Sequence, residues 1–386
     1  MPERTSRQHR RRASGLRAAS FGAGRAALLP FLVSRAVVVG ALLLARFLVT
    51  AVRPRAHAAI VAAHAGLLAW DANWYRRIAA LGYTRAGLGS LRFFPLYPLA
   101  ARAVSLVPGV TTDAALLIIA NLSGFLALAL IYRLVLIETS DEALAARAAF
   151  WLALFPVSFV LSMGYADSLL LATSLAVFLA LRTRHFATAA VAGLLAGASR
   201  PVGLLLALPA LLEAARDWHA VARHSWWSRI AAVAAAPVGA GCFLAWSKLH
   251  DGNFFLPLSS QLSRQNRGGL ADPLATIAHD VSYLLHGRHL GTALHAPWAV
   301  LLVFLAIVAL RRWPICYGAY AVVTLAVTLT APNLTSLERY ALACFPFSLA
   351  LATLTERRAV GIAAFALSGA ALAGYALLTF LGAYIP

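Results

Sequence analysis

The sequence predicts an all-α polytopic membrane protein with about eleven transmembrane helices, in a range of about 10–13. Hydrophobic residues make up 61% of the 386 residues, only 12% are charged, and the mean hydropathy is +0.77. A soluble domain could not bury that much apolar surface. The net charge of +19 does not indicate nucleic-acid binding, because the basic residues lie mostly in loops between apolar runs, as the positive-inside rule requires.

The chain begins with a basic stretch and continues into a first apolar run. Residues 1–25 are rich in arginine and have no apolar period, so we expect a disordered cytoplasmic tail before a single transmembrane domain over 26–386. The run at about 26–51 is long enough to cross a hydrocarbon core of ~30 Å. It carries Arg35 and Arg46, which must face protein or snorkel. With the basic tail inside the cell, this helix leads outward.

A long external loop is expected over 52–112. It contains a polar island from Trp70 to Tyr83, in which an acid is flanked by two tryptophans and two arginines. Such an island is costly beside a bilayer, which indicates that it has a task there. A second block, Phe93-Phe94-Pro95-Leu96-Tyr97-Pro98-Leu99, is apolar, but its prolines, its shortness and the nearby Arg102 favour a helix lying in the interface. We therefore predict interfacial helices within this loop.

The remaining spans follow from the apolar runs and from the arginines between them. If residues 93–107 lie flat in the interface, the later short loops with clustered arginines all fall inside the cell. Further external loops are expected at 250–295 and 332–338, and the C-terminus is placed outside. The expected spans lie at about 113–137, 146–163, 167–182, 186–199, 202–215, 230–249, 296–311, 314–331, 339–355 and 359–384.

Two neighbouring spans, 186–199 and 202–215, are too short to cross a bilayer straight. They meet at Ser199-Arg200-Pro201, where the proline removes a backbone donor and bends the chain. A break at membrane depth is tolerated only against protein or a wet cavity, so the arginine there is a candidate site residue. Gly193 and Gly197 form a GxxxG motif, which is more typical of helix packing than of function.

This topology brings a set of polar side chains to the external side. Arginine suits phosphate through its planar fork of donors, and a carboxylate beside an apolar wall can act as a general base. The set therefore predicts a cavity that handles an anion and a proton. Asp71 and Asp167 are the expected catalytic residues. The expected phosphate ligands are Arg200, Arg339, Tyr340, Arg76 and Arg77, and the expected substrate-lining residues are Trp70, Trp74, Tyr97 and Tyr165.

Each candidate also has a purely structural interpretation. Asp71 could cap a helix that starts at Ala72, since aspartate is a preferred N-cap. Trp70, Trp74 and Ile78 recur every four residues, as in the apolar stripe of an interfacial helix. The other structural alternatives are headgroup contacts for Arg76 and Arg77, simple ion pairing for Asp167, and interface snorkelling for Arg339.

Several chemistries have no motif in this chain. There is no GxxxxGK[ST] phosphate loop and no glycine-rich nucleotide turn, so the donor of any transferred group should be membrane-borne. No cofactor, metal or nucleic-acid partner is expected. The histidines that crowd loop 250–295 lack a convincing ligand spacing; they are His279, His286, His289 and His295.

Short motifs follow one another in order along residues 26–350. They are Trp70-Asp71 with Ile78-Ala79 and Gly82-Tyr83; Phe94-Pro95-Leu96-Tyr97-Pro98; Phe155-Pro156 with Tyr165-Ala166-Asp167-Ser168-Leu169; Ser199-Arg200-Pro201-Val202-Gly203; and Arg339-Tyr340 with Phe345-Pro346. In this order they resemble the GT-C superfamily of polytopic glycosyltransferases, most closely the PIG-V-like mannosyltransferases and their bacterial relatives. Relatives tend to carry Glu where this chain has Asp167.

The resemblance implies a GT-C-like fold that transfers a sugar, typically mannose, from polyprenyl- or dolichyl-phosphate on the non-cytoplasmic face. It implies inversion by single displacement, without a nucleotide, and it maps the family's loop-one acid onto Asp71 as the general base. The composition, with Lys248 as the only lysine, suggests a bacterium and hence the bacterial inner membrane. The acceptor is left open among a glycolipid, a glycan and a protein hydroxyl.

Two other functions stay open at this point. A transporter or flippase of an anionic or lipid-linked substrate would also use intramembrane arginines and a broken helix. The long external loop and the lack of visible internal repeats weigh against it. A non-catalytic membrane scaffold for cell-envelope synthesis would tolerate neutral substitution of Asp71.

Overall fold

The computed structural model describes residues 2–52, 57–217, 225–262, 268–286, 295–332, 334 and 336–384. These parts are helical and contain no strand, as the sequence predicts. The elements in order are α1 (Pro2–Val52), α2 (His57–Ala65), η1 (Gly66–Leu68), α3 (Asp71–Leu81), α4 (Tyr83–Ala86), η2 (Leu88–Arg92), α5 (Leu96–Val104), α6 (Thr112–Thr139), α7 (Glu142–Leu154), η3 (Ser158–Leu161), α8 (Asp167–Arg182), α9 (Phe186–Ser199), η4 (Pro201–Leu206), α10 (Ala207–Ala215), α11 (Trp226–Asp251), α12 (Leu256–Gln261), α13 (Pro273–Leu285), α15 (His295–Arg312), α16 (Ile315–Leu329), α17 (Leu337–Ala343), α18 (Pro346–Leu354) and α19 (Arg358–Phe380).

The apolar segments expected to be helical are helical, and two of them have the predicted bounds. α8 and α9 begin and end at the residues expected from the sequence. The segment 146–163 differs, because α7 ends at Leu154 and a short 3-10 turn, η3, follows it. Phe155 precedes Pro156 and adopts ψ 136°, outside the helical region. Proline disfavours helical geometry in the residue before it, which explains the break.

Helix length limits how many of these elements cross a membrane straight. Among the described residues, five helices are long and apolar enough: Gly22–Val52 within α1, α6, α11, α15 and α19. The bent pair α17 and α18, with an angle of 85°, raises the number to six if it counts as one broken span. Crossing takes roughly 20 residues, and α8, α9 and α16 have 16, 14 and 15. The structure therefore supports a polytopic membrane protein, with fewer long helices than the eleven expected spans.

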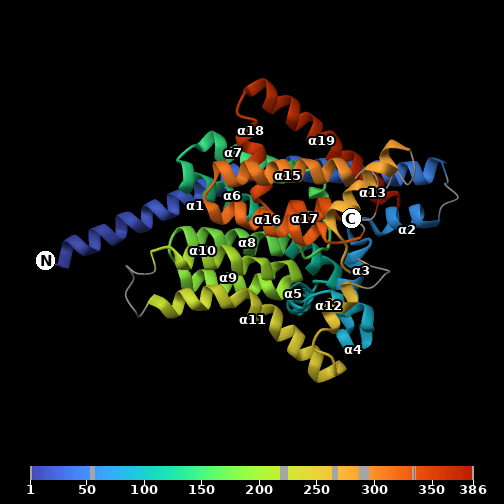
Figure 1. The fold of residues 1–386 in the computed structure, drawn as a ribbon, viewed down its shortest axis with the longest axis horizontal. Helices are drawn as coiled ribbons and strands as arrows, with labels where there is room; N and C mark the ends of the chain where they lie inside the picture. The colour runs from blue at the N-terminus through green and yellow to red at the C-terminus, as the bar shows by residue number, and fades with distance from the viewer. Residues whose placement is uncertain are drawn as a thin grey trace.

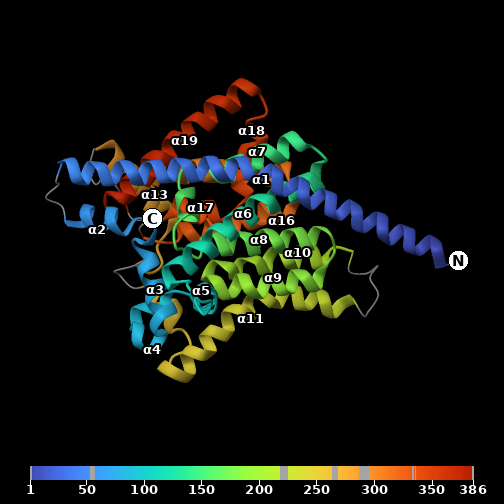
Figure 2. The same ribbon diagram turned by 180° about the vertical axis from the view of Figure 1, so that it is seen from behind.

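The first helix begins earlier than the sequence suggests. α1 starts at Pro2 and runs to Val52, so residues expected to form a disordered tail lie in a helix continuous with the first apolar run. Arginine and alanine, which are frequent in this stretch, are among the better helix formers, which favours continuation of the helix. Seen from behind, α1 passes across the other helices (Figure 2).

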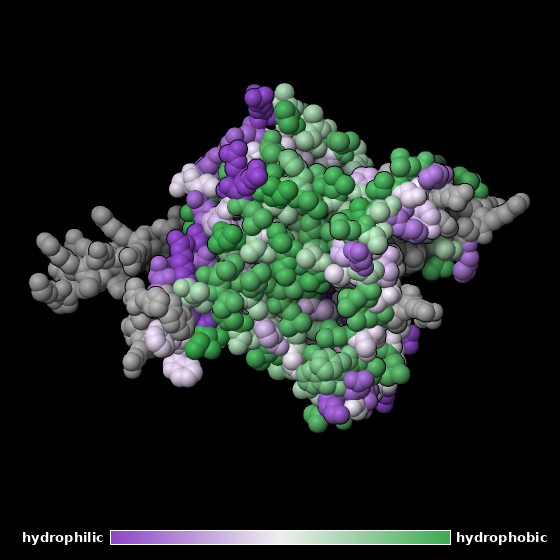
Figure 3. Space-filling view, in the orientation of Figure 1, coloured by the Kyte–Doolittle hydropathy of each residue, from purple (hydrophilic) through white to green (hydrophobic). Residues whose placement is uncertain are grey.

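The broad face of the molecule is apolar. Figure 3 shows hydrophobic residues over its middle and hydrophilic residues gathered toward the two ends. The loop helices α2, α3, α4, α12 and α13 lie together at one end, opposite the end from which the start of α1 projects (Figure 1). This distribution is the one expected of a helix bundle that spans an apolar layer.

Close packing of α9 on α11 places the break after Ser199. Gly197 lies against the backbone of Ala236, and Gly239 lies against the carbonyl of Leu194, so that a Cβ at either glycine would overlap the neighbouring helix. This confirms that the GxxxG motif serves helix packing. The contact fixes the end of α9, from which the next residue, Arg200, departs in an extended conformation.

The predicted first loop is built of short helices. α5, inside the block that could be mistaken for a span, has nine residues and is about 14 Å long. It is thus too short to cross a hydrocarbon core of ~30 Å as a straight helix. α3 and α5 pack on each other through Tyr75, Phe93 and Tyr97, whose rings meet edge to face with centroids 5.0 and 4.9 Å apart.

Candidate functional site

α3 presents Asp71 at its first residue. The residue before it, Trp70, has φ 58° and ψ −120°, a conformation that a bulky residue adopts only when its surroundings impose it. Two contacts do so: the indole Nε1 of Trp70 donates to the carbonyl of Thr379 (3.3 Å), and the backbone N–H of Asp71 donates to the hydroxyl of Tyr165 (3.3 Å). The structural alternative of Asp71 as an N-cap does not hold, since Trp70 has that position and no side chain caps the helix. The carboxylate of Asp71 is therefore available for other contacts.

Asp167 opens α8 in the same way. Its carboxylate is almost completely buried, with 3% of the side chain exposed. A negative charge at a helix N-terminus interacts favourably with the helix dipole, but that alone does not offset the cost of burying it. Two arginines from distant segments supply the compensation.

Arg339, in the short helix α17, connects the two acids. Its Nη1 lies 2.7 Å from Asp71 Oδ2, while its Nη2 and Nε lie 2.7 and 3.0 Å from the two oxygens of Asp167. The planar fork of a guanidinium suits this arrangement of several acceptors. The guanidinium also lies 4.6 Å from the centre of the Tyr165 ring. A single buried arginine thus binds both acids that the sequence singles out.

Arg200, in the break between α9 and η4, completes the group. It forms an ion pair with Asp167 Oδ1, and its guanidinium lies 5.8 Å from the centre of the Tyr340 ring. The four residues Asp71, Asp167, Arg200 and Arg339, called here the site cluster, come from four separate segments of the chain. Sequence reasoning predicted that all four converge, and the structure confirms it.

The site cluster is balanced in charge but uneven in exposure. It holds two carboxylates and two guanidinium groups, which satisfies the rule that buried charges are paired. The exposed side-chain fractions are 3% for Asp167, 4% for Arg339 and 14% for Arg200, against 29% for Asp71. Of the two acids, Asp71 is the one that a molecule entering the site can reach.

Tyr75 belongs beside the cluster and was missed by sequence reasoning. It lies one helical turn after Asp71 on α3, is buried, and has all four members of the site cluster among its charged neighbours. Burial raises the pKa of Tyr75, so its phenol stays protonated at neutral pH and can act as a donor. Its position four residues after Asp71 in a helix is the signal that could have indicated it.

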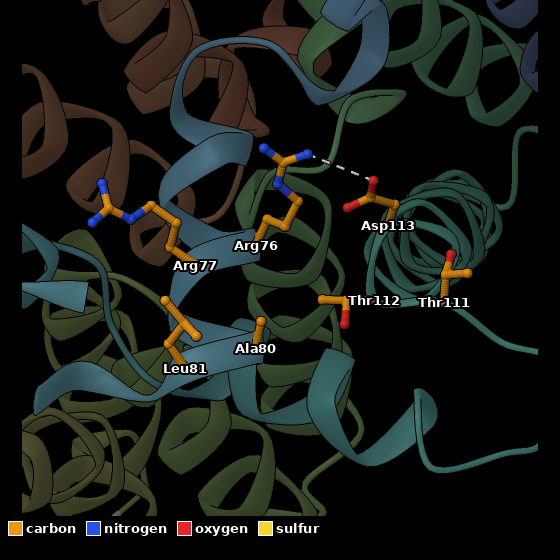
Figure 4. A pocket seen from close by; sticks show the side chains of 7 residues that line it. All are labelled: Arg76, Arg77, Ala80, Leu81, Thr111, Thr112 and Asp113. Carbon is orange, nitrogen blue, oxygen red and sulfur yellow. Dashed lines mark ion pairs between the residues drawn. The ribbon is translucent and has the colours of Figure 1, made fainter. Parts of the chain in front are cut away.

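The other expected site residues lie elsewhere on α3 and α5. Trp74 stacks on Phe93 with ring centroids 5.9 Å apart, and Tyr97 is fully buried with its hydroxyl donating to the carbonyl of Leu116. Both therefore have packing roles. Arg76 and Arg77 line a pocket between α3 and the start of α6 (Figure 4). There Arg76 binds Asn73 and lies 3.7 Å from Asp113, and no contact joins it to the site cluster.

A second buried group lies next to the site cluster and was also missed. Glu338, the residue before Arg339, has 1% exposure and accepts a hydrogen bond from Nδ1 of His295 at 2.7 Å. The sequence placed His295 only in a histidine-rich loop and did not connect it with Glu338. The described residues contain no group of three or more side chains that could hold a metal ion, and His289 lies outside them.

A search for relatives adds no information about this site. No family model matches the chain, and no curated protein matches it.

Proposed function

We propose that this chain is a membrane glycosyltransferase that moves a sugar, mannose in the first instance, from a polyprenyl-phosphate donor to an acceptor hydroxyl. The observation that carries the proposal is the pairing of one reachable carboxylate, Asp71, with a buried arginine, Arg339, that is shared with Asp167. This arrangement supplies a proton acceptor and an anion-stabilising group within one hydrogen bond of each other. The order of motifs that resembles GT-C enzymes supports the same reaction.

Asp71 acts as the general base in this mechanism. It takes the proton of the acceptor hydroxyl as that oxygen forms a bond to the anomeric carbon of the sugar. The bond between the anomeric carbon and the phosphate oxygen breaks, and its electron pair leaves with the lipid phosphate. Asp167 is not reachable as a nucleophile, because it is buried and bound to both arginines. A single displacement with inversion at the anomeric carbon follows.

Arg339 and Arg200 stabilise the negative charge that grows on the leaving phosphate. Both are already oriented by Asp167, so little reorganisation is needed when the charge develops. Tyr340 lies against Arg200 and helps to hold it toward the site. Asp167 thereby serves to orient the arginines rather than to transfer a proton.

The proposal includes the arrangement in the membrane. Eleven crossings with the N-terminus in the cytoplasm place the site cluster on the external face of a bacterial inner membrane, where lipid-linked sugars are used without nucleotides. The shorter helices then cross where the bilayer is locally thinner or where their flanking residues extend to the interface, and α9 meets η4 at the break that carries Arg200. The acceptor is a glycolipid, a glycan or a protein hydroxyl.

The test is transfer of radiolabelled mannose from polyprenyl-phosphate mannose in membranes that contain the wild type, Asp71→Asn or Asp217→Asn. Asp217 is a matched control, since it is 59% exposed and pairs with Arg184, away from the site cluster. We expect a labelled product with the wild type and the control and none with Asp71→Asn. Equal transfer by Asp71→Asn would remove Asp71 as the base. If no protein transfers label and a cysteine at position 71 is modified from both sides of the membrane, transport replaces transfer as the function.

A further inference from the structure

Glu338 is a buried acid beside the site cluster to which the proposed mechanism assigns no function. It is adjacent to Arg339 in α17 and is equally buried, at 1% exposure. A carboxylate at that depth is strongly destabilising unless partners compensate it. Its partners therefore indicate what it does for the site.

Those partners come from two distant elements. Nδ1 of His295, the first residue of α15, donates to Glu338 Oε1 at 2.7 Å. The hydroxyl of Tyr384, after the end of α19, donates to Glu338 Oε2 at 3.4 Å. His295 is also buried, at 8% exposure. α17 has only seven residues and is too short to be stable by itself, so contacts with other segments, these two among them, hold it in place.

The C-terminal segment that contains Tyr384 also contacts the start of α3, where Asp71 lies. Thr379, near the end of α19, accepts the hydrogen bond of Trp70 that fixes the start of α3. Tyr384 holds Glu338 and so the start of α17. Asp71 and Arg339 lie 2.7 Å apart, and the residue before each of them hydrogen-bonds to the stretch 379–384.

We propose that Glu338, paired with His295 and Tyr384, is a positioning residue that fixes α17 so that Arg339 reaches Asp71 and Asp167 at once. This inference rests on the proposed function for its catalytic consequence. The contact geometry itself does not depend on it.

The hydrogen bond from His295 also satisfies one oxygen of the buried Glu338. Asp280 is the other acid close to His295, and burial raises the pKa of Asp280, which favours its protonated form. The hydrogen bond of 2.7 Å identifies Glu338 as the partner of His295. Removing His295 leaves the buried carboxylate of Glu338 without its closest partner, which destabilises the position of α17. Removing both partners leaves no such charge.

A double-mutant cycle tests this directly. We compare mannose transfer from polyprenyl-phosphate mannose by the wild type, His295→Gln, Glu338→Gln and the double variant. Glu356→Gln is the control, because the Glu356 side chain is 70% exposed. We expect kcat of His295→Gln to fall about tenfold, with KM for the donor changed less, because Arg339 acts on charge that develops in the transition state. The double variant should be about as slow as the slower single variant, because both substitutions break the same contact that helps to fix α17.

The outcomes separate this inference from the proposed function. If the wild type transfers mannose and neither single variant is slowed, or the losses of the two single variants multiply in the double variant, the positioning role is overturned. If His295→Gln does not fold, Tyr384→Phe replaces it, with an expected loss of about threefold in kcat. If the wild type neither transfers mannose nor is stabilised by polyprenyl phosphate, the proposed function fails. The unfolding temperatures of the cycle then decide the pairing: His295→Gln must lie below the double variant.

Discussion

Two buried networks of acids and arginines lie at opposite ends of α8. The site cluster includes Asp167, the first residue of this helix, and a second network includes Arg182, the last one, about 22 Å away. In this distal network Arg182 binds Glu138 (2.5 Å) and Glu213 (2.7 Å), and Tyr317 donates to Glu138 (2.8 Å). The two groups use the same chemistry, so the difference between them lies in where the backbone places them.

The distal network joins residues within or at the ends of regular helices, namely α6, α8, α10 and α16. Arg182, Glu138 and Glu213 are each at least 85% buried, and an exposed arginine, Arg216, lies 3.9 Å from Glu213, so both acids are less accessible than Asp71. The site cluster instead draws on a strained helix start, a break after α9 and a seven-residue helix. The site cluster thus lies at interruptions of helices, whereas the distal network joins regular helices.

The largest expected difference between the two networks is in activity. Asp71→Asn should lower the transfer rate by about 10²–10⁴, the usual contribution of a general base. Glu138→Gln, which changes an acid to its amide in the distal network, should leave the rate per folded molecule unchanged. Rates are to be measured with both proteins at equal folded concentration. A comparable loss in Glu138→Gln would mean that the two networks are not functionally distinct.

The next effect is on stability and should be of similar size at both ends. Arg339→Met and Arg182→Met each leave two carboxylates without their shared arginine, which costs about 3–5 kcal/mol of unfolding free energy. Unfolding in detergent measures it. Only Arg339→Met should also abolish transfer by the folded fraction. If Arg182→Met proved no less stable than the wild type, the interpretation of the distal network as a structural lock would be wrong.

Much of this arrangement could be predicted from the sequence. Apolar runs and arginine spacing predicted the first and last residues of α8 and α9 correctly. Polar residues at interruptions of the apolar pattern indicated the site cluster. Trp74 and Tyr97, which were expected to line the substrate, stack on Phe93 and hydrogen-bond to the carbonyl of Leu116, respectively. Helical spacing alone shows which residues share a face, but not which neighbouring helix covers that face.

The pairing of Glu338 with His295 could not be predicted. The two residues are 43 positions apart in sequence, and the histidine opens a helix that looks like an ordinary apolar span. Likewise, nothing in the sequence shows that Trp70 binds the end of α19 across 309 positions. Contacts between segments that are far apart depend on how the whole bundle packs, which periodicity does not specify.

A smaller effect tests whether helix packing places the break at Arg200. Gly197→Ala puts a Cβ into the backbone of Ala236 on α11, so we expect a loss of about 1–3 kcal/mol and a displaced Arg200 with reduced transfer. Gly241→Ala, on α11 itself, is the control because its Cβ would meet open space. Thermal unfolding and transfer are measured on both. If Gly197→Ala unfolded and transferred like the wild type, the contact between α9 and α11 would not determine the position of Arg200.

The smallest expected effect concerns the pH dependence of the site end. Burial raises the pKa of Tyr75, whereas an unfolded chain loses the tyrosine proton near pH 10. The folded state therefore holds more protons than the unfolded state above that pH, and stability falls as pH rises beyond about 10, by up to about 1.4 kcal/mol per pH unit. Tyr75→Phe removes this contribution and should lose less stability between about pH 9 and 11. Tyr283→Phe, at a half-exposed tyrosine of α13, is the control for unfolding curves at each pH. If Tyr75→Phe followed the wild type at every pH, the phenol would already ionise in the folded protein, and Tyr75 would not be a fixed donor beside Asp71.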